Sequence, residues 1–239
     1  MQQPFFSFVI PAHNEASIIK ETLSRLCALD YPKERYEVIV VENGSNDKTY
    51  EVAKQFESSN MHVYSTPEPG VSRARNFGMH RSSPDLDWSI VMDADNFLEK
   101  SFLQELCVFL EAHPKAAYGM AQIQPDRTTA KARFWFWYRN LTDRLLRTMD
   151  TIHIVRKDLV GVAQYPEGFH FTEDLQYAEA LRAAGRGEYF FLPTKSMVSS
   201  TRRFEKYGYL NKILYDVYIG VRYAINKDAF RDKDWERIR

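Results

Sequence analysis

The sequence predicts an α/β fold with a central, mainly parallel sheet flanked by helices. Two observations support this prediction: short apolar segments alternate with segments of helical periodicity in the first half, and three of the four apolar segments end in polar residues. The 239 residues, of which 44% are hydrophobic, are enough for one large domain with a substantial core. In such folds, ligands bind beyond the carboxyl ends of the parallel strands.

Four apolar segments bounded by turn residues are predicted to be buried strands: residues 5–10, 36–41, 61–65 and 88–92. Residues 15–29 are predicted to form the first helix, because they place Ile19, Leu23, Leu26 and Cys27 on one stripe. The later helices of this half are a helix through Val52 and Phe56, the segment 72–80, and a helix opened by the capping-box pair Ser101 and Gln104.

The second half is less regular. Residues 134–138 are five consecutive aromatic residues in a basic segment, which we interpret as core with part of an acceptor wall, although basic aromatic helices also lie on lipid surfaces. A helix is predicted to begin at Glu173 and to end at Gly185. The segment after residue 204 carries a long apolar stripe and is expected to pack on the domain; its members are Leu210, Ile213, Leu214, Val217, Val221, Ala224 and Ile225.

The pair Asp93 and Asp95 follows the strand 88–92 directly. About one D-x-D pattern is expected by chance in such a chain, and three occur, the others being Asp85/Asp87 and Asp232/Asp234. Only the pair at 93 and 95 stands at the carboxyl end of a predicted strand. In extended backbone, residues i and i+2 project to one side, so these carboxylates are predicted to hold Mn²⁺ or Mg²⁺. An acidic loop without a ligand is the alternative.

Two further segments carry candidate chemistry. "EPGVSRARNFG" places Gly70, Arg73, Arg75 and Asn76 around a short helix, which suits phosphate binding; a solvated basic helix face is the alternative. "TED" places Glu173 and Asp174 at a helix start, where a like-charged neighbour would raise the proton affinity of Asp174 and suit a general base. Helix capping is the alternative there.

Composition excludes several classes. Lys+Arg and Asp+Glu balance at 32 each, which argues against nucleic acid as a partner. Two distant cysteines favour a reducing compartment. No signal peptide and no apolar run of about 18 residues is recognised, so we expect a soluble, cytoplasmic protein and leave open peripheral attachment to the inner face of a membrane. Zinc-protease, serine-hydrolase, P-loop and dinucleotide motifs are missing from the sequence.

Five segments together, in chain order, resemble the family 2 glycosyltransferases of the GT-A fold: "VIPAHNEASI", "VIVVENGSNDKT", "GVSRARNFG", "VMDADN" and "TEDLQ". The resemblance covers roughly residues 5–185 and is specific as an ordered set, although each segment alone is weak. It implies a Rossmann-like sandwich of the GT-A type, a nucleotide-diphospho-sugar donor, a divalent metal ion and inversion at the anomeric carbon.

The resemblance also implies roles for individual residues. Asp95 and Asp93 would hold the metal ion, and Asp174 would be the catalytic base with Glu173 beside it. Glu42 stands where the family usually has aspartate and adds one methylene at the base pocket, where uridine is favoured. The residues expected to bind the nucleotide sugar are Pro11, Ala12, His13, Glu15, Glu42, Asn43, Arg75, Asp93, Ala94, Arg202 and Arg203.

The expected organisation is a nucleotide-sugar-binding half at residues 1–125, an acceptor-binding and catalytic-base half of the same domain at 126–203, and a helical tail at 204–239. "SSTRRFEKYG" resembles the R-R-F/W-x-x-x-G segment of smaller, non-processive members. The expected function is sugar transfer to a glycan, lipid-linked or small-molecule hydroxyl acceptor. Two alternatives stay open: a sugar-nucleotidyltransferase, disfavoured because no glycine-rich loop follows the first strand, and a non-catalytic nucleotide- or glycan-binding module.

Overall fold

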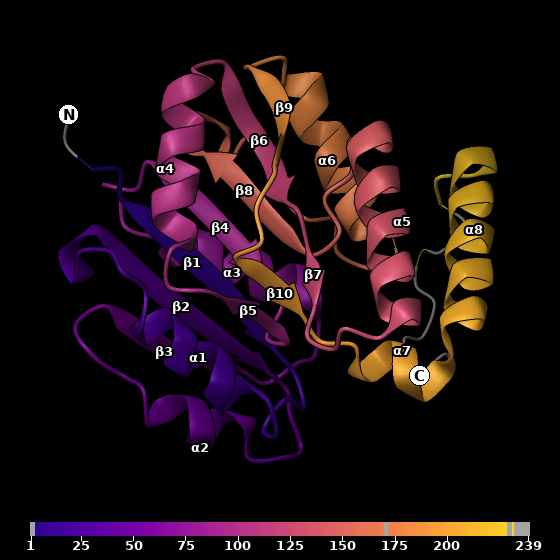
Figure 1. Cartoon of the computed structure of the whole chain (residues 1–239). Coiled ribbons are helices and arrows are strands. Elements are labelled where there is room, and N and C mark those ends of the chain that lie inside the picture. Colours follow the sequence, from indigo (N-terminus) through magenta and orange to yellow (C-terminus); the bar gives the residue numbers. More distant parts are fainter. Residues whose placement is uncertain (1–2, 170–171, 229–230, 232–239) are drawn as a thin grey trace.

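The computed structural model describes residues 3–169, 172–228 and 231, except for the side chains of Arg203 and Tyr207. Helices flank a seven-stranded sheet (Figure 1). In sheet order its strands are β3 (Met61–Thr66), β2 (Tyr36–Asn43), β1 (Phe6–Ala12), β4 (Trp88–Met92), β8 (Ile152–Arg156), β6 (Ala116–Ala121) and β9 (Glu188–Leu192). Most neighbouring strands are parallel, which confirms the predicted α/β fold with a mainly parallel central sheet.

Strand β8 is the exception, because it runs antiparallel to both of its neighbours, β4 and β6. The four strands predicted from the sequence are β1, β2, β3 and β4, whereas β6, β8 and β9 of the second half were not predicted. The register of β4 and β8 pairs Val91 with His153. A histidine is thereby buried one residue away from the end of β4, where the Asp93 segment begins.

The described helices agree with the sequence prediction in number and order through the first half. They are α1 (Ile19–Cys27), α2 (Thr49–Lys54), α3 (Val71–Arg81), α4 (Phe102–Ala112), α5 (Ala130–Leu146), α6 (Glu173–Ala184), α7 (Arg202–Tyr207) and α8 (Tyr209–Ile225), with short 3-10 turns η1 (Lys33–Arg35) and η2 (Lys157–Leu159).

Two details of these helices differ from the prediction. The apolar stripe of α1 is buried at Ile19, Leu23 and Leu26, but Cys27 is exposed. The capping box before α4 is not formed: Gln104 donates to Asp30 instead, and the side chain of the N-cap residue makes no capping hydrogen bond. For Gln104, a contact elsewhere in the fold replaced the local pattern.

Helix α3 packs directly on β1 and β2. Its residue Ala74 joins Ile39 and Val41 in a small buried cluster. A Cβ atom at Gly78 would lie only 2.3 Å from Cγ1 of Val9, so the close approach of helix and sheet requires glycine at this position. This approach fixes where α3 presents its polar residues at the edge of the sheet.

A second, three-stranded sheet lies beside the first and has the order β5 (Asn96–Leu98), β10 (Met197–Ser199), β7 (Gln124–Pro125). Strand β5 begins directly after Asp95, and β10 leads into α7. The small sheet therefore brings the start of α7, more than 100 residues further along the chain, next to the segment that follows β4.

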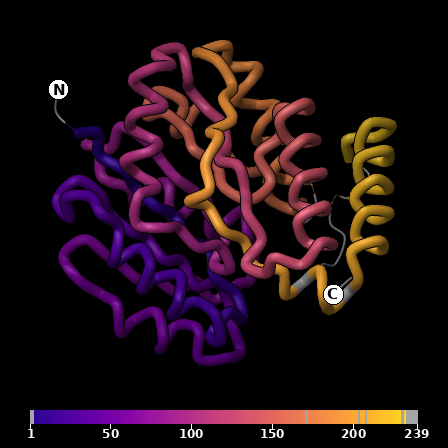
Figure 2. Tube along the Cα trace, viewed as in Figure 1, coloured from indigo at the N-terminus to yellow at the C-terminus, as the bar shows by residue number. Residues whose placement is uncertain are grey.

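Helices α5 and α8 lie at the edge of the molecule farthest from β3, and the chain trace shows α8 as the outermost element (Figure 2). Arg139 of α5 interacts electrostatically with Asp216 of α8. Tyr223 on α8 donates a hydrogen bond to Glu179 on α6 (3.0 Å). Within the described residues, no helix combines the length and apolar character needed to cross a membrane.

The expectation that the apolar stripe of α8 packs on the domain is wrong. The buried residues of α8 are Ile219 and Tyr223, which lie on the other side of the helix. The stripe faces outward, with Leu210 67% exposed and Ile225 79% exposed, and Ile213 is the member that packs against the core. The helix is therefore amphipathic as predicted but attached through its more polar side.

Candidate active site

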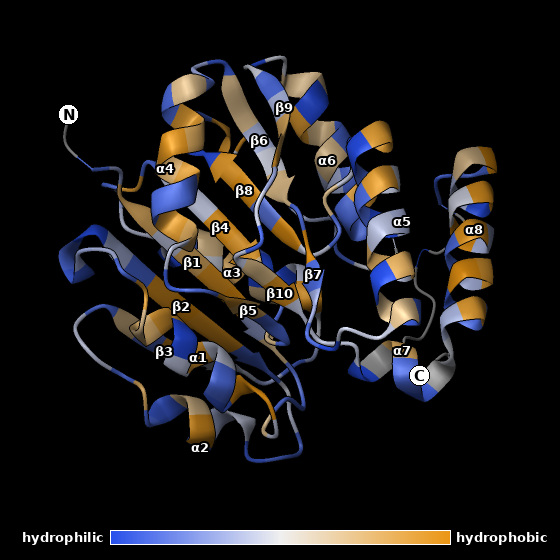
Figure 3. Cartoon of the chain, viewed as in Figure 1, coloured by the Kyte–Doolittle hydropathy of each residue, from blue (hydrophilic) through white to orange (hydrophobic). Residues whose placement is uncertain are grey.

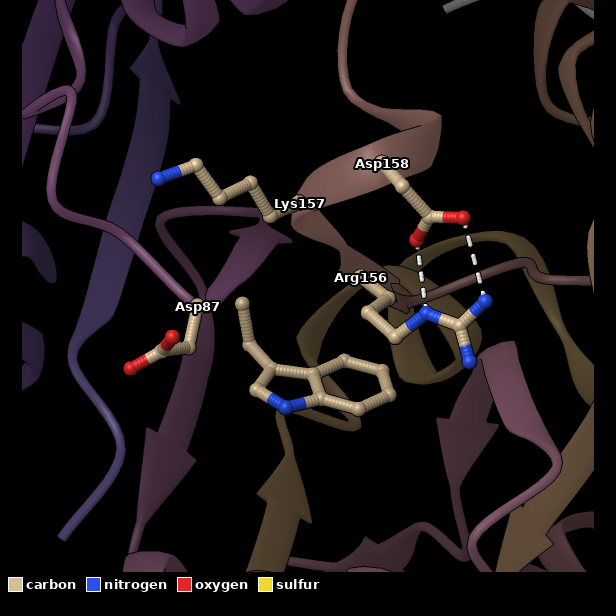
Figure 4. A pocket seen from close by; sticks show the side chains of 5 residues that line it. Asp87, Arg156, Lys157 and Asp158 are labelled. Carbon is tan, nitrogen blue, oxygen red and sulfur yellow. Dashed lines mark hydrogen bonds and ion pairs between the residues drawn. The ribbon is translucent and has the colours of Figure 1, made fainter. Parts of the chain in front are cut away.

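The strands β1, β2 and β4 end at the same edge of the sheet. The register pairs Ala12, the last residue of β1, with Glu42 of β2, and β4 ends at Met92. The polar segments that follow these strands meet at this edge. The open hollow in Figure 4 lies at the opposite end of β4; it is lined by Asp87, Trp88, Arg156, Lys157 and Asp158.

Asn43 ties three loops together at this edge. Its amide nitrogen donates to the carbonyl of Ala12 (3.1 Å), and its amide oxygen accepts from the backbone N–H of Gly70 (3.1 Å). The backbone carbonyl of Asn43 also pairs with Nδ1 of His13 (2.8 Å). Asn43 is buried, so its side chain acts here as a fixed connector between the ends of β1 and β2 and the start of α3.

Glu42 is buried and is held by two donors. Its Oε1 accepts from the backbone N–H of Ser45 (2.5 Å), and its Oε2 accepts from the hydroxyl of Ser65 on β3 (2.5 Å). The longer side chain of glutamate, compared with aspartate, spans from β2 to these two partners. Both carboxylate oxygens thus already have a hydrogen-bond donor from the protein.

Glu15 and Arg202 come together although they are far apart in the sequence. Nη2 of Arg202 lies 2.6 Å from a carboxylate oxygen of Glu15, and its Nη1 donates to Ser17 (3.3 Å). These contacts of Arg202 bind the start of α7 to the loop after β1. Pro11 and Ala12, also expected near the nucleotide, are buried at the end of β1.

The Asp93–Asp95 segment is a turn. The backbone N–H of Asn96 donates to the carbonyl of Asp93 (3.2 Å), which closes the turn directly after β4. This finding corrects the expectation that extended backbone directs both carboxylates to one side. The side chain of Asp93 is 30% exposed, whereas Asp95 is buried.

The turn is anchored from two sides. The hydroxyl of Thr22 on α1 donates to the carbonyl of Ala94 (2.5 Å). The backbone N–H of Ser200, just before α7, donates to the carbonyl of Asp95 (3.2 Å). The side chain of Ala94, which is predicted to lie beside a nucleotide sugar, is buried.

Arg75 is the centre of the candidate site. This buried guanidinium lies 3.0 Å from Asp93 Oδ1 through Nη2, and 2.5 Å from Asp174 Oδ1 through Nη1. Glu173 Oε1 lies 3.7 Å from the same Nη1. Residues from α3, from the turn after β4 and from the start of α6 thus converge on one side chain. The side chain of Asp174 is 21% exposed and can be reached from solvent.

An aromatic floor supports this cluster. The guanidinium carbon of Arg75 lies 5.1 Å from the ring centroid of Tyr165, and that ring stacks on Tyr177 at 3.9 Å. Asn76 makes two hydrogen bonds of 2.9 Å with the backbone of Tyr165. His153 pairs with the hydroxyl of Tyr165 through Nδ1 and brings Nε2 to 3.6 Å from Asp174 Oδ1.

The roles of Tyr165, Tyr177 and His153 were not predicted from the sequence. A lone histidine within an apolar strand is ordinarily a core residue, and no local pattern announces the two tyrosines. Asn76 was named with Arg75 for phosphate binding, whereas its side chain binds the backbone of Tyr165.

Burial controls the electrostatics of the cluster. It raises the pKa of Asp174 well above its ordinary value; Arg75 opposes this effect, while Glu173 and Asp93 add to it. Burial also raises the pKa of Glu173. One guanidinium faces three carboxylates, so at full ionisation the cluster carries two uncompensated negative charges. A proton or a cation would relieve this repulsion.

The helix start at Glu173 confirms the predicted boundary of α6, and Gly185 ends this helix in the left-handed conformation. The capping alternative for the "TED" segment is not supported, because Thr172 makes no side-chain capping bond and instead accepts from Gln176 Nε2 (3.1 Å). The solvated alternative for Arg75 is also wrong, since this residue is buried. Arg73, by contrast, pairs with Glu68 on the surface.

The residues present fit a divalent metal ion. Mg²⁺ and Mn²⁺ commonly take one or two carboxylates and complete their shells with water and substrate phosphates. Among the described residues there is no set of three or more His, Cys, Asp or Glu side chains arranged as a metal site. Asp93, which belongs to the cluster, and Asp95, two residues further in the same turn, are the carboxylates that could form such a partial site. Glu173 Oε2 is buried with no hydrogen-bond partner among the described atoms.

The two other D-x-D patterns and Arg203 do not contribute to the described cluster. Asp85 and Asp87 precede β4 and lie away from the cluster. Asp232 and Asp234 fall outside the described residues, as does the side chain of Arg203.

Comparison with known proteins identifies relatives of the chain. Glycosyltransferase AglE of Haloferax volcanii is 43% identical over 83 residues, 34% of this chain and 27% of that protein. The poly(ribitol-phosphate) beta-N-acetylglucosaminyltransferase TarS of Staphylococcus aureus is 27% identical over 187 residues, 73% of this chain and 30% of that protein. The chain therefore matches less than a third of the length of these relatives.

Solved structures show the same fold. The crystal structure of S. aureus TarS 1–349 with UDP-GlcNAc has a TM-score of 0.66 at 20% identity and covers 82% of this chain and 58% of that one. The mannosyltransferase PcManGT from Pyrobaculum calidifontis, with GDP-Man and Mn²⁺, has a TM-score of 0.64 at 17% identity and covers 84% and 57%. The model of the family described as "Glycosyl transferase family 2" matches residues 7–162, well over half of the chain. The chain belongs to glycosyl transferase family 2.

Proposed function

We propose that the chain transfers a sugar from a UDP-linked donor to a hydroxyl acceptor with inversion at the anomeric carbon. The observation that carries this proposal is the convergence of Asp93, Glu173 and Asp174 on Arg75. Arg75 thereby contacts both the turn that is the candidate metal site, through Asp93, and the candidate base, Asp174. A donor-binding module that performs no chemistry has no need for the second of these groups.

The donor half of the proposed site lies at the ends of β1, β2 and β4, within residues 1–125. The loops joined by Asn43 would surround the nucleoside, with His13 and Glu15 at the rim. Support comes from the family match and from the neighbour TarS, whose structure holds UDP-GlcNAc. Glu42 would contribute by fixing the loop at Ser45 and the end of β3 rather than by a free carboxylate.

The diphosphate would lie between the turn after β4 and the start of α7. Asp93 and Asp95 would hold Mn²⁺ or Mg²⁺, and a bound divalent ion offsets the charge that develops on the departing diphosphate. Arg202, the first residue of α7, would supply a positive charge there; in the structure it pairs with Glu15. The Mn²⁺ complex of PcManGT supports the choice of metal ion.

Asp174 would act as the base, in the half formed by residues 126–203. Its carboxylate accepts the proton of the acceptor hydroxyl, whose oxygen then forms the new bond to the anomeric carbon as the bond to the diphosphate breaks. A raised pKa suits a group that must take up a proton near neutral pH. Arg75 would hold Asp174 in place and would compensate part of the negative charge beside it.

Donor hydrolysis tests the proposal, because water can replace an unidentified acceptor. We expect UDP release from a UDP-sugar in the presence of Mn²⁺, and Asp174→Asn should lower this rate by about 100-fold or more. UDP binding, measured by calorimetry, should change little, because the nucleotide contacts are on other elements.

Asp85→Asn is the matched control, since it removes a carboxylate from a D-x-D pattern outside the cluster. Its turnover should equal that of the unaltered chain. Undiminished hydrolysis by Asp174→Asn would reject this residue as the base. UDP binding without turnover by the unaltered chain would favour the binding-module alternative. Release of pyrophosphate from UTP and a sugar 1-phosphate, without UDP release from a UDP-sugar, would favour a nucleotidyltransferase.

A further inference from the structure

Exposed large hydrophobic side chains are concentrated on two helices. The described part of the chain has thirteen of them, and eleven lie on α5 and α8. On α5 they are Phe134, Trp137, Leu141, Leu145 and Leu146, and on α8 they are Leu210, Leu214, Val217, Tyr218, Val221 and Ile225. We call these eleven residues the α5/α8 face. The remaining two, Val108 and Val162, are isolated and belong to other elements.

Four of the five exposed hydrophobic residues of α5 form one stripe. Phe134, Trp137, Leu141 and Leu145 have spacings of three, four and four residues and therefore share a side of the helix. The buried residues Trp135 and Phe136 attach the opposite side of α5 to the core. The helix is thus fixed in the fold, with Phe134 60% and Trp137 58% exposed.

The exposed residues of α8 form a second stripe, from Leu210 to Ile225. The other side of α8 is held by Tyr223, which donates to Glu179, and the ammonium of Lys227 just after the helix lies 2.5 Å from the same carboxylate. Figure 3 shows apolar bands on both helices at this edge of the molecule. The stripe of α8 therefore faces outward because of specific contacts on its polar side.

Both helices carry a net positive charge. The exposed charged side chains of α5 are Lys131, Arg133 and Arg144, and its single acidic residue, Asp143, is buried. On α8, Arg222 is exposed, whereas the acidic residue Asp216 is paired with Lys212. An apolar stripe flanked by cations and bearing an exposed tryptophan is the composition of helices that lie in the headgroup region of a bilayer.

We propose that the α5/α8 face binds the surface of a membrane that contains anionic phospholipids. A second copy of the chain is the other occupant with an apolar surface, but pairing two such faces would bring together helices that each carry a net positive charge, so part of their cations would lack acidic partners. Anionic headgroups supply those partners and accept the apolar side chains between them. Since α6 carries Asp174 and contacts α8 through Glu179, docking would hold the acceptor half of the proposed site near the lipid surface.

Vesicle flotation with the full chain tests this proposal without any sugar donor. Binding to vesicles of phosphatidylcholine with phosphatidylglycerol should exceed binding to phosphatidylcholine alone and should weaken as salt is added. The double variant Arg133→Gln/Arg144→Gln should lose about fivefold in affinity for each cation removed. The variant Trp137→Gln/Leu141→Gln should lose about tenfold or more.

Matched controls exist elsewhere on the surface. Val108→Gln replaces an apolar residue that is 69% exposed on α4, and Lys20→Gln/Lys100→Gln removes two exposed cations near α1. Both should bind vesicles like the unaltered chain. All replaced residues are exposed, so thermal unfolding should confirm that each variant remains folded.

Three outcomes would overturn the proposal: absence of flotation with anionic vesicles, equal flotation with neutral vesicles, or equal losses in the control variants. A dimer in solution that is dissociated by Trp137→Gln/Leu141→Gln, in a chain that does not float with vesicles, would assign the face to a second copy instead.

Discussion

At the scale of single residues, His153 connects the core of the sheet with the candidate base. Burial, and next the charge of Arg75, hold its pKa well below the ordinary value, so the ring is neutral. Burial keeps Tyr165 protonated by raising its pKa. We assign the single phenolic proton to the bond with Nδ1, which leaves the proton of the imidazole on Nε2. This nitrogen lies 3.6 Å from Asp174 Oδ1, and the ring also makes a hydrogen bond with the backbone of Met149.

His153→Phe should shift the pH dependence of donor hydrolysis. Phenylalanine keeps the ring between β8 and Tyr165 but removes the donor beside Asp174. The charged form of Asp174 then loses a favourable neighbour, so the acid limb of the kcat/KM profile should move to higher pH and the rate below neutral pH should fall several-fold.

The pH profile separates this role from a purely structural one. Loss of packing or of the bond to Tyr165 alone would lower the rate equally at all pH values. Tyr165→Phe is the companion variant, since it breaks the same hydrogen-bond chain one step further from Asp174. An unchanged acid limb in His153→Phe would show that the imidazole does not influence the base.

The residues that the sequence analysis located lie in short polar motifs at the ends of predicted strands or at the starts of predicted helices. Asp93, Glu173 and Arg75 could be named because each lies in a short polar motif beside a predicted element. Their joint contact, the turn at Asp93–Asn96 and the bond of Glu42 to Ser65 could not, because each depends on packing between segments that are far apart.

At the scale of elements, the end of α5 contains a buried acidic residue. Burial, then the neighbouring Asp150, raises the pKa of Asp143 from 3.8 to about 7, although Arg139 and Thr148 act in the opposite direction. Between these two values the folded chain retains a proton that the unfolded chain has lost. The free energy of unfolding should therefore fall as the pH rises from about 4 to about 7 and should stay at the lower value above that range.

Asp143→Asn should flatten this dependence. Asparagine is of nearly the same size and its oxygen still accepts from Thr148, but it cannot ionise. Compared with the unaltered chain, the variant should gain a few degrees in Tm at pH 8 relative to pH 5. Thermal unfolding at both pH values provides the test, with Asp85→Asn as the control. Parallel curves for the variant and the unaltered chain would contradict the assignment.

Element prediction succeeded where a local pattern and the tertiary environment agree. The strands β1, β2 and β4 are continuous apolar runs because both faces of a parallel sheet are covered. Strand β8 was not predicted, because the histidine and the arginine in "IHIVR" interrupt the apolar run; in the fold they bind Tyr165 and Asp158. Its antiparallel place in the sheet also cannot be recognised in its sequence. For α8, periodicity gave the stripe but could not tell which side faces the domain.

At the scale of the whole molecule, the site is assembled from both halves of the chain. The turn after β4 is held by α1 on one side and by the residue before α7 on the other. Arg202 extends from α7 to the loop after β1. Metal, diphosphate and nucleoside would therefore bind to a single connected surface, so occupancy of one part should favour occupancy of the next.

Mn²⁺ and UDP should therefore stabilise the chain more together than separately. In the proposed site, Asp93 and Asp95 would supply only part of a coordination shell and a diphosphate would supply further oxygens, so each ligand should raise the affinity for the other. At a concentration about 100 times Kd a ligand adds about 2.7 kcal/mol of stability, which corresponds to roughly 5–10 °C in Tm. Thermal unfolding with each ligand alone and with both should show a joint shift larger than the sum. Removal of the metal by EDTA and the change Asp95→Asn should each abolish the part of the joint Tm shift that exceeds the sum. Asp85→Asn should preserve it. Simple additivity of the two shifts would mean that metal and nucleotide do not share a site.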